Sequence, residues 1–130
     1  PHRPLDRRVP NGRVVNVSSV GLPFNGDPRA QYAVFERRDD AWDVEFRQVP
    51  YDREQFLTIY EESGFLDDGG ITASILRMEV QQARPFLVPF MKWTEIEDID
   101  PNDHHYEEFL ELYEPEDPMG SFFSKFQDDS

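Results

Sequence analysis

The chain has 130 residues, a formal net charge of −14, 38% hydrophobic residues and no cysteine. This length and apolar content suffice for one domain with a packed core, whereas the negative charge opposes binding to nucleic-acid backbones and to anionic membranes. Without cysteine the chain has no disulfides and no thiolate ligands. We find no signal peptide and no apolar run near the ~18 residues that a membrane helix needs. We therefore expect a cytoplasmic protein.

The N-terminal part of the chain has the residue patterns of β-strands. The dipeptide Asn11-Gly12 is a strong turn signal and predicts a hairpin whose second strand is short and buried. Further on, Trp42, Val44 and Phe46 alternate with charged residues, which predicts a strand with one face in water. We expect strands over residues 5–9, 14–17, 31–36 and 42–49.

After Pro50, the apolar residues recur at helical spacing and follow residues that cap helices well. We expect helices over residues 53–63, 71–83 and 104–113. Their candidate N-caps are Asp52, Asp67 or Asp68, and Asn102 or Asp103. The apolar stretch 85–93 is interrupted by Pro89, so we expect an edge strand or a packed extended segment there.

These elements predict an α+β fold in which antiparallel strands are followed by helices. We divide the chain into three regions: 1–65 with the strands and the first helix, 66–114 as a helical extension, and 115–130 as an acidic tail that contains phenylalanines. Residues 95–130 hold 13 acidic side chains and one lysine. Through Phe122, Phe123 and Phe126 the tail offers apolar anchors as well, so one interpretation of the chain is a noncatalytic module that binds a basic partner.

Four short motifs in residues 1–34 occur in an order typical of one enzyme family. They are His2-Arg3-Pro4, then Asn16 with Ser19-Val20-Gly21, then Gly26-Asp27-Pro28-Arg29-Ala30, and then Tyr32-Ala33-Val34. In these motifs the chain resembles the C-terminal portion of the calcineurin-like metallophosphoesterase superfamily, in its compact prokaryotic phosphodiesterase branch. The resemblance covers roughly residues 1–65. It departs from the family at Val17-Ser18, where the family has Pro-Gly, and at Pro1, where threonine is common.

The resemblance implies a metallophosphoesterase-type α/β sandwich and two divalent metal ions (Mn²⁺, Fe²⁺, Zn²⁺ or Ni²⁺) that activate a water molecule for attack on a phosphate ester. Among the residues of this chain it makes His2 a metal ligand, the last of a set whose other members lie upstream of Pro1. It also makes Asn16, Ser18 and Arg29 candidates for substrate binding, Arg29 through a bidentate contact with phosphate. The alternatives are local turn hydrogen bonds for Asn16 and Ser18, and an ion pair of Arg29 within its own loop.

We therefore expect part of a two-metal phosphoesterase that hydrolyses phosphate mono- or diesters and is incomplete as it stands, because one imidazole cannot hold two metals. Its expected partners are a small phosphate ester, the missing N-terminal part of the same domain and, through open sheet edges, a second copy of the chain. Binding to nucleic acid or to a membrane is not expected. The pair His104-His105 is not a metal site in this interpretation, because adjacent helical residues point about 100° apart.

Overall fold

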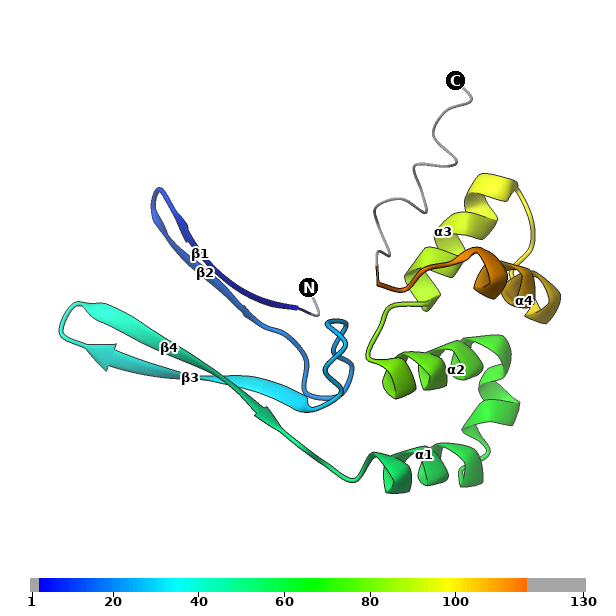
Figure 1. Ribbon diagram of the computed structural model, residues 1–130, viewed down its shortest axis with the longest axis horizontal. Helices are drawn as coiled ribbons and strands as arrows, with labels where there is room; N and C mark the ends of the chain where they lie inside the picture. Colours follow the sequence, from blue (N-terminus) through cyan, green and yellow to red (C-terminus); the bar gives the residue numbers. More distant parts are fainter. Residues whose placement is uncertain (1–2, 117–130) are drawn as a thin grey trace.

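A computed structural model describes residues 3–116 of the chain and has an α+β fold. Four strands come first and four helices follow, which confirms the predicted order of strands before helices. The strands are β1 (Pro4–Val9), β2 (Gly12–Val17), β3 (Ala30–Arg38) and β4 (Ala41–Val49), and the helices are α1 (Arg53–Glu62), α2 (Phe65–Gln82), α3 (Leu87–Glu97) and α4 (Asp103–Leu112). Figure 1 shows the strands as two arms on one side of the molecule and the helices packed together on the other.

The strands form two separate antiparallel hairpins, β1–β2 and β3–β4, instead of a single sheet. The first hairpin closes through Pro10 and Asn11, because Val9 lies directly opposite Gly12. The hairpin predicted from Asn11-Gly12 is therefore confirmed, with its two-residue loop one position earlier than the dipeptide suggested. Each hairpin has two open edges within the described part of the chain, since neither pairs with a third strand there.

The expectation of a buried strand over residues 14–17 is wrong. Val14 is 49% exposed, and the remaining residues of β2 are exposed or half-buried. The physical reason is the arrangement in Figure 1, in which the helices lie beside the hairpins and do not cover them. Arg13 connects the two hairpins instead: its guanidinium pairs with Asp6 at 2.5 Å and donates to the backbone carbonyl of Trp42.

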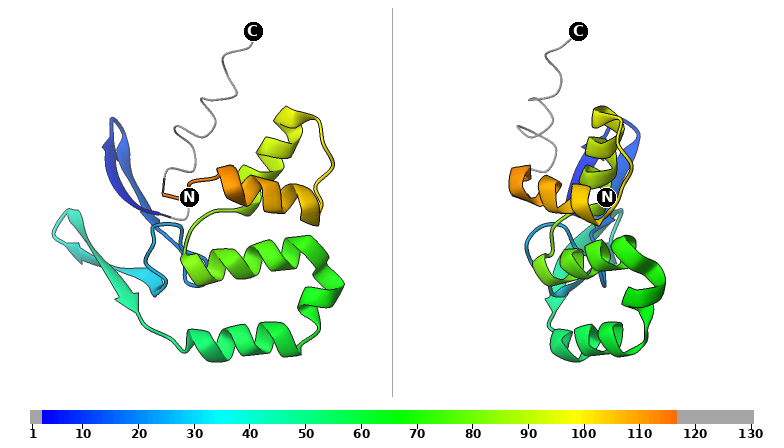
Figure 2. Two further views of the ribbon diagram at one scale, coloured as in Figure 1. Left: turned by 45° about the vertical axis from the view of Figure 1, so that its right-hand side comes forward. Right: turned by 90° about the vertical axis from the view of Figure 1, so that its right-hand side faces the viewer.

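Helices α1 and α2 lie side by side (Figure 2). Asp52 caps α1 as predicted, because its Oδ1 accepts a hydrogen bond of 2.9 Å from the backbone N–H of Gln55. Gly64 has a φ of 78°, a left-handed conformation that glycine adopts without strain, and it separates the two helices.

The start of α2 differs from the prediction. The helix begins at Phe65 with Gly64 as its N-cap, so neither Asp67 nor Asp68 caps it; both lie in the first turn. Gly70 then interrupts the helix with a φ of 54° and a ψ of −139°. The regular helix continues only after this kink, which is why the apolar spacing placed the beginning of the helix near residue 71.

The prediction of an extended segment over residues 85–93 is also wrong, because α3 occupies Leu87–Glu97. Pro89 is the third residue of this helix. In the first turn of a helix the backbone N–H groups have no helical partner, so a proline there breaks no hydrogen bond. The last helix was predicted closely: Asn102 is the N-cap of α4, and its Oδ1 accepts from the backbone N–H of His105 at 2.9 Å.

The hydrophobic core belongs to the helices. It is mostly aromatic, and Phe90, at its centre, is fully buried between the rings of Trp93, Tyr106 and Phe109 at centroid distances of 5.1–6.3 Å. The core cluster consists of Ile75, Phe86, Phe90, Trp93, Tyr106, Phe109 and Tyr113. Each of these residues lies in or next to α2, α3 or α4, and none comes from a hairpin.

A buried acidic side chain from α2 caps the N-terminus of α3. The carboxylate of Glu79, on α2, accepts hydrogen bonds from the backbone N–H groups of Phe86 at 2.7 Å and Leu87 at 2.9 Å. These are two of the N–H groups that a helix leaves without partners at its N-terminus. Glu79 thus supplies from a neighbouring helix the cap that Phe86, the N-cap residue, cannot provide.

Candidate functional site

Three stretches with predicted site residues meet at the base of the first hairpin, close to the long loop between β2 and β3 (Figure 1). Pro4 lies opposite Val17 in the hairpin register, so Arg3 and Ser18 leave the hairpin at the same end. Arg3 also reaches the loop, because its Nε donates a hydrogen bond of 3.1 Å to the carbonyl of Phe24. The predicted metal ligand His2 lies outside the described residues.

Asn16 and Ser18 form a tight local turn. The side-chain Oδ1 of Asn16 accepts a hydrogen bond of 2.9 Å from the backbone N–H of Ser18. Ser18 has a φ of 75°, in the left-handed region that residues with a Cβ rarely adopt. The Asn16 amide stabilises this conformation, so the local hydrogen bond considered for these two residues is present.

Gln31 organises the loop from the inside. Its side chain is 1% exposed and exchanges two hydrogen bonds with the amide of Asn25, at 2.8 and 3.2 Å. It also donates to the backbone carbonyl of Asp27 at 3.0 Å, while its own N–H donates to the carbonyl of Ser19. Gln31 therefore holds the loop at two places, through its buried side chain at Asn25 and Asp27 and through its backbone N–H at Ser19.

Arg29 pairs with a carboxylate of its own loop. Its Nε and Nη2 face Asp27 Oδ1 and Oδ2 at 2.9 and 2.6 Å, and the Arg29 backbone N–H adds a bond of 3.1 Å. The hydrogen bonds from the Arg29 guanidinium lower the pKa of the Asp27 carboxyl. About half of the Arg29 side chain is exposed, so the guanidinium is held in one orientation and still faces solvent.

The loop is anchored to the helices at Gly26. Its N–H donates to the carbonyl of Ala83, at the end of α2, at 3.0 Å, and its φ is 78°. A Cβ at this position would lie 2.6 Å from Nη2 of Arg84. Glycine is needed here for the left-handed backbone and for the close approach of the arginine.

Between the two hairpins lies an apolar groove of about 280 Å³. Val15 of the first hairpin and Phe35, Trp42 and Val44 of the second line it, together with the stem of Arg13. The groove is open, and Trp42 remains 55% exposed. An exposed aromatic residue next to other apolar side chains marks a surface that another part of a protein can cover.

The described residues do not assemble a metal site by themselves. Between Arg3 and Glu116 no group of three or more His, Asp or Glu side chains is placed to hold a metal ion. The rings of His104 and His105 lie 5.6 Å apart and are tilted by 37°; His104 faces Glu108 at 3.5 Å, whereas His105 contacts the carbonyl of Asp100. This donor set does not fit a two-metal centre, which requires several ligands for each ion.

The sequence interpretation identified Asn16, Ser18 and Arg29 but missed the residues that position them. Gln31, Asn25 and Gly26 carry the loop's internal hydrogen bonds and its contact with α2. A usable signal existed for Gln31: it is a polar residue at the beginning of a predicted strand, directly after a loop rich in turn residues. The anchors Phe122, Phe123 and Phe126, on which the alternative of a binding module rests, lie outside the described residues.

Comparisons with known proteins yield no relatives. No family model matches the chain, no curated protein is similar to it at a significant level, and no solved structure matches its fold. Among residues 3–116, no helix is both long and apolar enough to span a membrane.

Proposed function

We propose that residues 1–65 are the C-terminal part of a metallophosphoesterase domain and that they contribute the last metal ligand and a phosphate-binding loop to a hydrolytic site. The observation that carries this proposal is the convergence of Arg3, the Asn16–Ser19 turn and the loop of Asp27 and Arg29 at one end of the first hairpin. The motifs quoted for the resemblance are separate in sequence. Their clustering in space is what a shared site requires.

The backbone at Ser18 supports the resemblance at the position where the sequence departs from it. The family has glycine there, and Ser18 has the left-handed φ of 75° that glycine favours. The Asn16 amide holds the serine in this conformation. The substitution therefore leaves the turn able to keep the shape that a glycine would give it.

The exposed hairpins support the role of a partial domain. Trp42 and Val44 face an open apolar groove, and the helical core lies elsewhere. In this proposal the upstream part of the domain covers the groove and supplies the remaining metal ligands, because the described residues lack them. Two divalent metals would activate water and stabilise charge on the phosphate.

Within this chain, Arg29 is the residue suited to the substrate. Its guanidinium is half exposed and is held by Asp27, so its remaining donors can contact phosphate oxygens without a search through rotamers. The Asn16 turn would fix the neighbouring backbone. Hydrolysis of a phosphate mono- or diester is the proposed reaction class.

The test uses the full gene product that contains this chain, assayed with bis-p-nitrophenyl phosphate and Mn²⁺. We expect hydrolysis that chelators abolish and that His2→Ala lowers by at least ~100-fold, since a lost ligand weakens the metal centre. Arg29→Ala is expected to raise KM more than it lowers kcat. His104→Ala, on α4, is the matched control and should retain activity.

Two results would contradict the proposal. One is a full gene product that is inactive with Mn²⁺, Fe²⁺, Zn²⁺ and Ni²⁺ and with both mono- and diester substrates. The other is a metal-dependent activity that His2→Ala leaves unchanged.

A further inference from the structure

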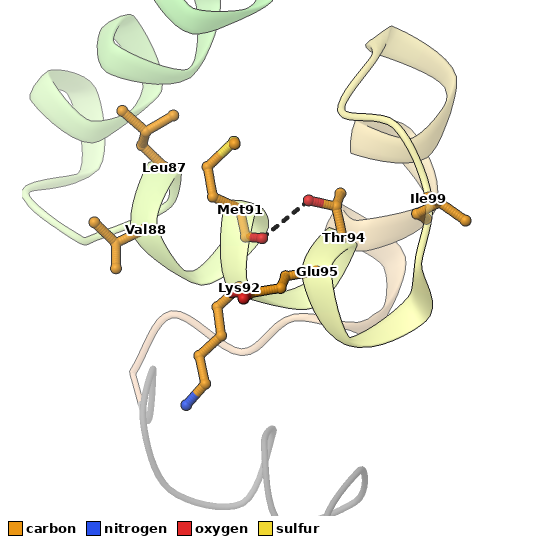
Figure 3. A pocket seen from close by; sticks show the side chains of 7 residues that line it. All are labelled: Leu87, Val88, Met91, Lys92, Thr94, Glu95 and Ile99. Carbon is orange, nitrogen blue, oxygen red and sulfur yellow. Dashed lines mark hydrogen bonds between the residues drawn. The ribbon is translucent and has the colours of Figure 1, made fainter.

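A second apolar surface lies on α3, far from the hairpins. It is a groove of about 700 Å³ whose lining includes Leu87, Val88, Met91, Lys92 and Ile99. Figure 3 shows Leu87, Val88 and Met91 along α3 and Ile99 on the segment that follows the helix. The residues of α3 that enter the core, such as Phe90 and Trp93, occupy other positions of the helix. Leu87 and Ile99 pack against the edge of the core, whereas Val88 and Met91 are 64% and 45% exposed, so the groove has an open apolar side.

The described chain ends near the beginning of this groove. Tyr113 packs edge to face on Phe86, the N-cap of α3, with ring centroids 5.6 Å apart, and its hydroxyl donates to the carbonyl of Pro85 at 2.6 Å. Glu116 follows three residues later, within about 10 Å of Tyr113. Leu87 and Val88, at the same end of α3, line the groove. A segment that continues from Glu116 therefore starts near the N-terminal end of α3.

The sequence after Glu116 has the pattern of an amphipathic helix. Asp117 followed by Pro118 is a favourable helix start, with an N-cap residue and a proline at the first helical position. Four apolar residues then follow at positions i, i+3, i+4 and i+7, which fall on one helical face. They are Met119, Phe122, Phe123 and Phe126. Such a stripe requires an apolar surface to pack against.

We propose that residues 117–127 form a helix that docks into the α3 groove of the same chain and covers Val88 and Met91. The lengths agree, because eleven helical residues span about 16 Å, the same as the eleven residues of α3. Both charge signs occur on each side: Lys92 and Glu95 line the groove, and the tail carries Lys125, Asp128 and Asp129. The proposal does not depend on the phosphoesterase assignment.

The lack of cysteine allows a direct test by thiol accessibility in the full chain. A single cysteine is introduced as Val88→Cys in the groove or, as the matched control, as Ile59→Cys on α1, where the native residue is 58% exposed. Without the tail contact the two thiols should react with iodoacetamide at similar rates. With the tail docked, we expect the Val88→Cys thiol to react at least ~10-fold more slowly than the control.

A second substitution ties the protection to the tail. Adding Phe122→Ser and Phe123→Ser to the Val88→Cys chain should raise its rate to that of the control, and Phe126→Ser alone should give an intermediate rate. Equal rates for Val88→Cys and Ile59→Cys in the unmodified tail would overturn the proposal. So would protection that the tail substitutions leave unchanged, or protection that increases with protein concentration, which would indicate that a second copy covers the groove.

Discussion

The hairpin region, residues 3–49, and the helical region, residues 53–113, bury their apolar residues very differently. The helices enclose an aromatic core in which Phe90 and Phe109 are completely buried, whereas Val14 and Trp42 of the hairpins remain about half exposed. The region with recognisable site motifs is therefore the one without a core of its own. The region with a core carries no site motif that the sequence reveals.

Few contacts join the two regions. Gly26 bonds to the end of α2 through the Ala83 carbonyl. Within the helical region, Arg53 of α1 donates to the carbonyls of Val80 and Gln81 in the last turn of α2 and so holds this end of the helix against α1. A cation at a helix C-terminus satisfies carbonyls that lack helical partners and interacts favourably with the helix dipole. The helical region can hold the loop in place through the bond at Gly26, but it does not cover the hairpins.

The largest loss of stability is expected from a substitution in the helical core. Phe90→Ala should lower the free energy of unfolding by about 3–5 kcal/mol, because it leaves a cavity between three aromatic rings. Trp42→Ala removes an aromatic residue from the hairpins and should cost less than about 1 kcal/mol. Urea denaturation of both variants measures the contrast, and equal losses would show that the hairpins are as well packed as the helices.

At alkaline pH, a loss of stability is expected in the helical region. Burial, and then the charge of Glu79, raises the pKa of Tyr106 to about 12 from its ordinary value of 10.0. The unfolded chain thus releases this proton first, so stability is complete below pH 10 and falls by about 2–3 kcal/mol as the pH rises to 12.

The variant Tyr106→Phe separates the contribution of Tyr106 ionisation from the rest of the alkaline loss of stability. The Tyr106 hydroxyl is buried with no hydrogen-bond partner among the described residues, so its removal should leave stability at pH 7 unchanged or slightly higher. Urea denaturation at pH 7, 10 and 12 should then show a smaller alkaline loss than in the natural chain. Tyr113, whose pKa burial also raises, accounts for part of the loss that remains. An unchanged alkaline profile would contradict the assignment.

In the hairpin region the largest loss is expected at a polar residue. Gln31→Leu has a similar volume but leaves the Asn25 amide and the Asp27 carbonyl without their partner, which should cost about 2 kcal/mol. Gln48 lies directly opposite Gln31 in the β3–β4 register and is exposed, so Gln48→Leu is the matched control. Thermal unfolding compares the two variants, and a neutral Gln31→Leu would mean that the loop does not depend on this network.

The smallest expected effect concerns the junction between the regions. Gly26→Ala forces a residue with a Cβ into a φ of 78° and displaces the flexible end of Arg84, at a cost of about 1 kcal/mol. Gly12→Ala, where no atom lies within 4 Å of the added Cβ, should change stability by less than half as much. Denaturation midpoints for the two variants measure this difference, and equal effects would indicate that the junction tolerates rearrangement.

Local sequence signals predicted most of the helices and strands, because caps, turns and alternation each depend on residues close together in the chain. The caps Asp52 and Asn102 act over three residues, and the alternation around Trp42 follows from the pleat of a strand. Pro89 misled the prediction because its effect depends on its position in a helix, which the sequence does not state. The exposure of Val14 could not be predicted either, because alternation and apolarity do not say whether a second layer exists to cover the strand.

The candidate site was predictable as a set of residues but not as a geometry. The motifs pointed to Asn16, Ser18 and Arg29, yet the pairing of Arg29 with Asp27 and the role of Gln31 depend on how the loop folds back on itself. The spacing between these residues in the chain contains no information about that fold.

The carboxylate of Glu79 also has a consequence for the order in which the helices assemble. Phe86 offers no side-chain acceptor, so a peptide corresponding to α3 would lack the hydrogen bonds that help nucleate its first turn. Those bonds become available only when α2 has formed and has placed the Glu79 carboxylate at the N-terminus of α3. Helix α3 should therefore grow on a template that α2 provides, and the two should melt together as one cooperative unit.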